Sequence, residues 1–165
     1  MKNVEPKNKQ EIITRRARMS DLPHLIKLQE ATADYHYQLN PEMWKNGKEL
    51  AKSIRKFLPK EIQDKKSQYL VAVSNGQIVG FATGYIKNSP ALRNSYGHIG
   101  TVFVLPEHRK KNIGKLFIKE LYEWMKKKGC HSMELNVELK NSLGMKAWKK
   151  LGFMATTQRM IQKIS

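Results

Sequence analysis

The 165-residue chain has a single cysteine, Cys130. One thiol can form neither a disulfide nor a thiolate zinc site within the chain, so a reducing compartment is expected. Long apolar runs are missing too: none approaches the roughly 20 residues that span a bilayer. Residues 1–11 lack the apolar core of a secretory signal. These absences predict a cytoplasmic protein, and 165 residues are the length of one ordinary domain.

Acidic residues are also few. Asp and Glu number 14 against 31 Lys and Arg, which gives a formal net charge of +17. Such a charge attracts polyanions, and the candidates are nucleic acid, ribosomes, acidic proteins and a phosphorylated cofactor. A lysine-rich solvated surface without a partner explains the same charge equally well. We expect residues 1–11 to form a flexible basic lead-in to a single domain over residues 12–165.

The apolar pattern predicts an α/β (α+β) fold with a sheet of mixed strand directions. Two β-rich runs flank Asn75-Gly76, a pair typical of a type I′ hairpin turn. From Ile113 the pattern changes to the helical period, and Gly129 ends that helix. The predicted strands cover residues 12–18, 69–74, 77–86, 96–105, 132–137 and 153–164; the helices cover 21–34, 45–57, 113–128 and 142–151. Pro59 should close the second helix, with residues 35–44 and 90–94 forming connections.

The segment from Val102 to Lys115 carries the strongest functional signal. A strand ends, a short basic loop follows, and a helix begins at Ile113-Gly114. The first amides of a helix are unpaired and lie at the positive end of its dipole, so they can hold a pyrophosphate. Gly114 lets phosphates approach the backbone, and Asn112 tolerates a left-handed or N-cap conformation. Further positive charge comes from Arg109, Lys110, Lys111 and Lys115.

Two common phosphate motifs do not fit this segment. The spaced glycines and the Lys-Ser/Thr pair of a Walker loop are absent, and so is a GxGxxG dinucleotide motif. From the basic residues alone, a helix start that binds no ligand is the competing interpretation.

Three motifs resemble those of the GNAT acetyltransferases. VFVLPEHRKKNIGKLFIKEL, residues 102–121, resembles their acetyl-CoA signature Arg/Gln-x-x-Gly-x-Gly/Ala, with Arg109, Asn112 and Gly114 at the three fixed positions. ITRRARMSDLPHLIKL, residues 13–28, resembles the opening strand and helix. NSLGMKAWKKLGF, residues 141–153, resembles the closing motif Asn-x-x-Ala-x-x-(Phe/Leu)-Tyr-x-x-x-Gly-Phe, with Gly144 in place of its alanine. The resemblance covers about residues 12–160.

This resemblance implies a mixed sheet of six to seven strands with two central strands splayed apart, flanked by about four helices. It also implies acetyl-CoA as co-substrate and no metal. The pantetheine arm would pair with the backbone of Val102, Phe103 and Val104. The pyrophosphate would lie on the amides of Lys110, Lys111, Asn112, Ile113, Gly114 and Lys115. Asn141 would contact the cofactor from the far side.

The catalytic residues depart from the family pattern. Trp148 stands where many members have a tyrosine that protonates the departing CoA thiolate, whereas an indole can only donate a hydrogen bond. The fourth strand lacks the usual glutamate, so His98, directly or through water, is a candidate base. Glu134 on the next strand is a second candidate, and Tyr96 is a weaker third. For His98 and Glu134 alike, the alternative is a strand side chain without a catalytic role.

The acceptor side is assigned through the resemblance as well. Tyr35, His36, Tyr37 and Trp44 fall where this family forms part of its acceptor site, although helix-packing aromatics would look the same. The expected activity is transfer of an acetyl group to a primary amine of a small molecule, protein or peptide. The competing function is a basic nucleic-acid or ribosome-associated module with little or no catalysis. We expect a monomer or homodimer that does not bind membranes.

Overall fold

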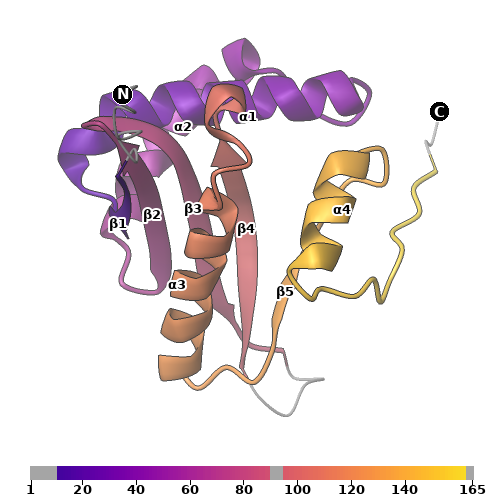
Figure 1. Ribbon diagram of the computed structural model, residues 1–165. Coiled ribbons are helices and arrows are strands. Elements are labelled where there is room, and N and C mark those ends of the chain that lie inside the picture. The colour runs from indigo at the N-terminus through magenta and orange to yellow at the C-terminus, as the bar shows by residue number, and fades with distance from the viewer. Residues whose placement is uncertain (1–10, 90–94, 163–165) are drawn as a thin grey trace, which may run out of the picture.

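The computed structural model describes residues 11–89 and 95–162 (Figure 1). The strands are β1 (Ile12–Arg16), β2 (Ser67–Ser74), β3 (Gln77–Lys87), β4 (Tyr96–Val104) and β5 (Met133–Leu135). The helices are α1 (Leu22–Leu39), α2 (Gly47–Gln63), α3 (Ile113–Lys127) and α4 (Ser142–Lys150), with short 3₁₀ turns at Met19–Asp21 and Pro106–His108. All but one residue of the expected lead-in, and the expected loop at 90–94, lie outside the described residues.

The strands form one mixed sheet in the order β1-β2-β3-β4-β5. The first four strands are antiparallel, and β5 is parallel to β4. Asn75 and Gly76 both have positive φ, at 49° and 77°, and join β2 to β3 as the predicted hairpin. The predicted α/β class with a mixed sheet is therefore confirmed.

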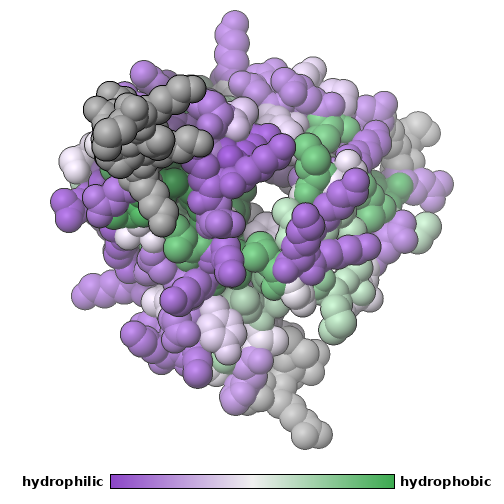
Figure 2. All heavy atoms as spheres, in the orientation of Figure 1, coloured by the Kyte–Doolittle hydropathy of each residue, from purple (hydrophilic) through white to green (hydrophobic). Residues whose placement is uncertain are grey.

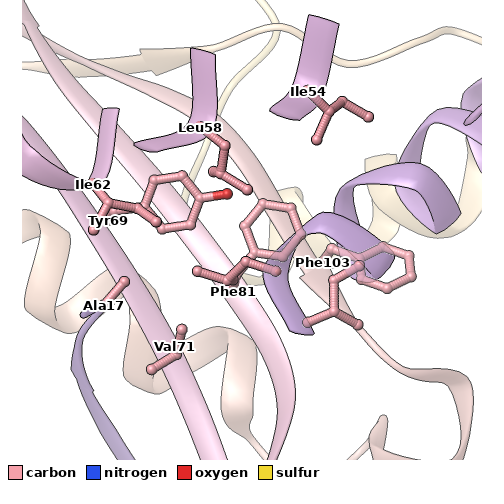
Figure 3. Close-up of a cluster of buried hydrophobic side chains, with 10 residues drawn as sticks. Ala17, Ile54, Leu58, Ile62, Tyr69, Val71, Phe81 and Phe103 are labelled. Atoms are coloured by element: carbon pink, nitrogen blue, oxygen red, sulfur yellow. The ribbon is translucent and has the colours of Figure 1, made fainter. Parts of the chain in front are cut away.

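Alternating side chains of the sheet pack into two cores. Tyr69, Val71 and Phe81 lie beneath α1 and α2 in one cluster with Leu25 of α1. The same cluster holds Leu58 and Ile62 of α2 (Figure 3). Leu70, Ala72 and Ala82 point to the opposite face and pack against Phe117 and Leu121 of α3. Because successive strand side chains alternate in direction, this division shows that α3 covers one face and α1 with α2 the other.

A bulge in β4 changes which side chains reach which face. Thr83 pairs with Thr101 and Gly84 pairs with Ile99, so Gly100 is an extra residue in β4. Ile99 therefore packs on the α3 face while Phe103 packs on the α1–α2 face, although they are four positions apart and would share a face in a regular strand. His98, which neighbours Ile99 in the strand, points to the α1–α2 side.

The pairing of β4 with β5 is short. It comprises Gly97 with Met133, His98 with Glu134, and Ile99 with Leu135. β4 continues for five more residues to Val104, while β5 ends at Leu135. The two strands separate beyond the ladder, and Figure 2 shows the molecule hollowed in the region where Figure 1 places the space between β4 and α4. This opening corresponds to the splay implied by the family resemblance.

Several element predictions were wrong. The described residues form five strands rather than six to seven, and residues 153–162 form no strand. Met154 and Met160 in that segment are 86% and 87% exposed, because no neighbouring strand of the described sheet covers them.

The second helix also differs from its prediction. It does not stop at Pro59 but runs to Gln63. The buried side chains of Leu58 and Ile62 on either side hold the chain in the core, which outweighs the backbone hydrogen bond that the proline removes. The first helix extends to Leu39, so Tyr35, His36 and Tyr37 lie on α1 rather than in a connection.

Candidate active site

The turn between β4 and α3 has an unusual backbone conformation. Lys110 and Asn112 both have φ of 62°, in the left-handed region. Arg109 donates from Nε to the carbonyl oxygen of Val104 at 3.1 Å and so ties the turn to the end of β4. Left-handed residues in such turns direct successive N–H groups into a shared concavity. The sequence predicts a left-handed or N-cap conformation for Asn112, and the residue is left-handed at the N-cap position of α3.

The start of α3 adds donors to this turn. The first backbone hydrogen bond of the helix runs from Leu116 N to Asn112 O at 3.1 Å. The amides of Ile113, Gly114 and Lys115 precede it, so the helix offers them no partner. A Cβ built on Gly114 would meet no atom within 4 Å, and the buried Ile113 anchors the helix start in the α3-side core. Exposed Arg109, Lys110 and Lys115 supply cations around this open space.

The two predicted bases meet across β4 and β5. His98 Nδ1 lies 3.0 Å from Glu134 Oε1, with the imidazole 13% and the carboxylate 54% exposed. A carboxylate can only accept, so Nδ1 carries the proton in the neutral ring and Nε2 keeps the lone pair. The parallel register thus brings Glu134 to His98 and orients the imidazole ring, next to the point where the two strands separate.

Trp148 has a packing partner. Its ring lies edge-on to Phe153 with centroids 5.4 Å apart, and both pack against the α3-side core. Its expected place near the thiol group stays a prediction.

The predicted acceptor aromatics lie together at the end of α1. Tyr35 donates from Oη to Asn141 Oδ1 at 2.9 Å, and Trp44 donates from Nε1 to Glu138 Oε1 at 2.8 Å. The His36 ring lies 5.1 Å from that of Trp44. Burial lowers the pKa of His36, although nearby Glu138 acts in the opposite direction. Tyr37 is exposed and takes part in none of these contacts.

Sequence reasoning missed one polar pair on the same face. Tyr85 pairs with His98 in the sheet and donates from Oη to Glu61 Oε1 at 3.1 Å. Burial raises the pKa of both groups, that of Tyr85 to about 12. Glu61 lies near the C-terminal end of α2, where a negative charge opposes the helix dipole. No sequence signal joins Glu61 to Tyr85, because only the packing of α2 on β3 brings them together.

The described part of the chain contains no helix long and apolar enough to cross a membrane. Within residues 11–89 and 95–162, no three His, Cys, Asp or Glu side chains gather as a metal site would require.

The architecture is that of a three-layered α/β domain, with helices on both faces of a splayed mixed sheet and an amide-lined turn at the start of α3. The model of the acetyltransferase (GNAT) family matches residues 28–153. The chain belongs to this family.

Two relatives are named for transfer of an acyl or acetyl group. The L-amino acid N-acyltransferase MnaT of Escherichia coli is 29% identical over 90 residues, which cover 54% of this chain and 51% of that protein. An N-alpha-acetyltransferase of Sulfurisphaera tokodaii is 24% identical over 161 residues, or 93% of this chain and 86% of that protein. The chain therefore spans about half the length of the first of these relatives.

Solved structures agree with the fold. The aminoglycoside N-acetyltransferase AAC(6')-Iy in complex with CoA superimposes with a TM-score of 0.74 at 20% identity, covering 96% of this chain and 97% of that one. Likeness at this identity shows the fold and leaves the acceptor open.

Proposed function

We propose that this protein is an acetyl-CoA-dependent N-acetyltransferase that acts on a primary amine. The observation that carries this proposal is the turn 109–112 with the first amides of α3, next to the opening beside β4. Backbone donors, a helix dipole and exposed cations converge on a space that no side chain fills. A diphosphate is the group that such an arrangement suits best.

The residues fit the cofactor that the family uses. The amides of residues 110–115 would hold the pyrophosphate, and Lys110 and Lys115 would add charge-assisted hydrogen bonds. The edge of β4 from Val102 to Val104 has no β5 partner and can pair with the amides of a pantetheine arm. When bound, acetyl-CoA supplies an activated acetyl thioester.

His98 is the base that the geometry favours. Glu134 fixes the Nδ1 proton, so Nε2 can accept a proton from the attacking ammonium, directly or through water. Glu134 thus acts as the residue that orients the imidazole. This pair is the second of the three pairs between β4 and β5, one residue before the strands begin to separate.

Binding of acetyl-CoA tests the proposal first. In calorimetry, the double variant Lys110→Ala/Lys115→Ala should bind acetyl-CoA about tenfold to 100-fold more weakly than the wild type, because two bonds to a charged group are lost. Lys119→Ala/Lys126→Ala removes the same charge from the exposed face of α3 and is the matched control. Equal losses in both variants would show that net charge, and not this turn, binds the cofactor.

Gly114 provides an independent check. Because a side chain there meets no protein atom, Gly114→Val should fold normally and still lose acetyl-CoA binding. Wild-type affinity in a folded Gly114→Val protein would place the phosphates elsewhere.

Turnover is followed as free thiol released from acetyl-CoA. The acceptor panel includes an L-amino acid, an aminoglycoside and a peptide with a free N-terminus. Similar proteins are named an L-amino acid N-acyltransferase, an aminoglycoside acetyltransferase and an N-alpha-acetyltransferase. Binding to RNA with a steep salt dependence, and none to acetyl-CoA, would instead support the basic nucleic-acid module. The cytoplasmic location, the single domain over 12–165 and the monomer or homodimer state stay predictions.

A further inference from the structure

Two hydrogen bonds connect the acceptor side to the segment before α4. They join Tyr35 to Asn141 and Trp44 to Glu138, and we call these four residues the bridge. The bridge joins parts of the chain that are 106 and 94 residues apart in sequence. In Figure 1 the far end of α1 lies above the start of α4, over the opening beside β4. Tyr35, an acceptor candidate, thus bonds directly to Asn141, a cofactor candidate.

The orientation of the Asn141 carboxamide follows from its partners. Gly144 N donates to Asn141 Oδ1 at 2.8 Å, and Tyr35 Oη donates to the same atom. A backbone N–H can only donate, so the Asn141 atom that accepts from Gly144 is the carboxamide oxygen and not the nitrogen. With Oδ1 accepting both bonds, the amide keeps its donor group Nδ2 as the atom to offer a ligand.

Gly144 makes this orientation possible. A Cβ at position 144 would lie 2.5 Å from Asn141 Nδ2 and 2.8 Å from its Cγ. An alanine, which the family motif has at this position, would therefore push the Asn141 side chain off the first turn of α4. Glycine lowers helix propensity, so its presence here costs stability. Its missing Cβ leaves the space in which the Asn141 side chain can bond with Tyr35.

We propose that Tyr35 is a positioning residue that holds Asn141 so that Nδ2 donates to a carbonyl oxygen of the pantetheine arm. The arm carries amide carbonyls, which accept hydrogen bonds, and the bridge lies over the opening that the arm would enter. Tyr35 thereby couples cofactor binding to the helix that forms the acceptor side. This inference rests on the proposed acetyl-CoA site.

The test compares CoA with a ligand that lacks its pantetheine arm and one phosphate of its pyrophosphate. CoA and adenosine 3′,5′-bisphosphate, which lacks the arm, are titrated calorimetrically into the wild type, Tyr35→Phe, Gly144→Ala and Tyr122→Phe. Tyr122 is an exposed tyrosine on α3 and serves as the control. Tyr35→Phe and Gly144→Ala should each bind CoA about fivefold more weakly, the effect of one lost hydrogen bond, and bind the bisphosphate as the wild type does.

A general structural defect would weaken the binding of both ligands together. The inference is overturned if Tyr35→Phe binds CoA with wild-type affinity, or if it loses affinity for CoA and the bisphosphate alike. Failure of the wild type to bind either ligand would contradict the proposed function itself, which separates the two ideas. Gly144→Ala keeps the tyrosine and changes only the space behind Asn141, so agreement between both variants supports the coupling.

Discussion

Single residues hold the proposed phosphate turn in shape. Asn112 adopts φ of 62° where the family signature has glycine. Asparagine reaches this region at low cost because its short polar side chain can hydrogen-bond locally, whereas β-branched residues cannot. The departure from the signature is therefore compatible with the backbone that the signature requires.

Substitution of Asn112 should separate conformation from charge. Asn112→Gly should keep both the unfolding free energy and the affinity for acetyl-CoA. Asn112→Val should destabilise the protein by about 1–2 kcal/mol, since a β-branched residue is forced into the left-handed region. Urea unfolding and calorimetry measure the two quantities. A stable Asn112→Val protein with full affinity would mean that the left-handed turn is not needed.

The buried Asp21 contributes stability that depends on pH. It accepts two bonds from Arg15, at 2.7 and 2.9 Å, and one from Arg18 N at 2.8 Å. The Arg15 hydrogen bond is the largest cause of its lowered pKa. A lowered carboxylate pKa stabilises the folded state above the unfolded pKa of about 3.9, and this contribution is lost as pH falls below it.

Asp21→Asn should therefore cost about 2 kcal/mol at pH 7, the worth of hydrogen bonds to a charged group, and much less in acid. Urea midpoints across pH 3 to pH 7, compared with those of the exposed control Glu123→Gln, measure this. A loss that is the same at both ends of the pH range would exclude the ion pair as its source.

Among the elements, β4 depends on the bulge at Gly100. A Cβ there would lie 2.6 Å from Tyr85 Cε2 and 2.7 Å from Thr83 Oγ1. Gly100→Ala should destabilise the protein by about 1–3 kcal/mol through overpacking and shift the β4 edge, which would weaken acetyl-CoA binding. Gly114→Ala, whose added methyl meets nothing, is the matched control. Thermal unfolding distinguishes them, and equal melting temperatures would contradict the steric argument.

Local signals predicted the elements that depend on short-range chemistry. Asn75-Gly76 fixed the hairpin, and the stop residues Gly129 and Gly152 both have positive φ, at 79° and 90°. The bulge at Gly100 and the passage of α2 through Pro59 depend on packing between distant segments. Those contacts leave no periodic pattern in the sequence, so these features could not be predicted.

The candidate site likewise has a part that the sequence predicts and a part that depends on the fold. The phosphate turn is contiguous, so its residues could be named from the sequence. His98 and Glu134 were each candidates, but their contact follows from the parallel register of β4 and β5. Tyr35 and Asn141 belonged to separate predicted sites, and only the fold of the chain joins them. Glu61 carried no signal at all.

At the scale of the whole molecule, the net charge of +17 should affect how the cofactor arrives. Acetyl-CoA is anionic, so the field of the protein accelerates encounter, and salt screens that field over a Debye length of about 10 Å at 0.1 M. The association rate in stopped flow should fall about tenfold between low salt and about 0.5 M KCl. A rate independent of salt would show that the surface charge serves another purpose.

The three-pair ladder between β4 and β5 has one more consequence. Beyond Ile99 the inner edge of the sheet needs a partner that the described chain does not supply, so a bound pantetheine arm would take the place of a strand. Amide protons along Val102 to Val104 and in β5 should then exchange with deuterium more slowly when CoA is present, because opening of this region would require release of the ligand. A small molecule would complete the sheet, and the rigidity of its centre would vary with the cellular supply of CoA.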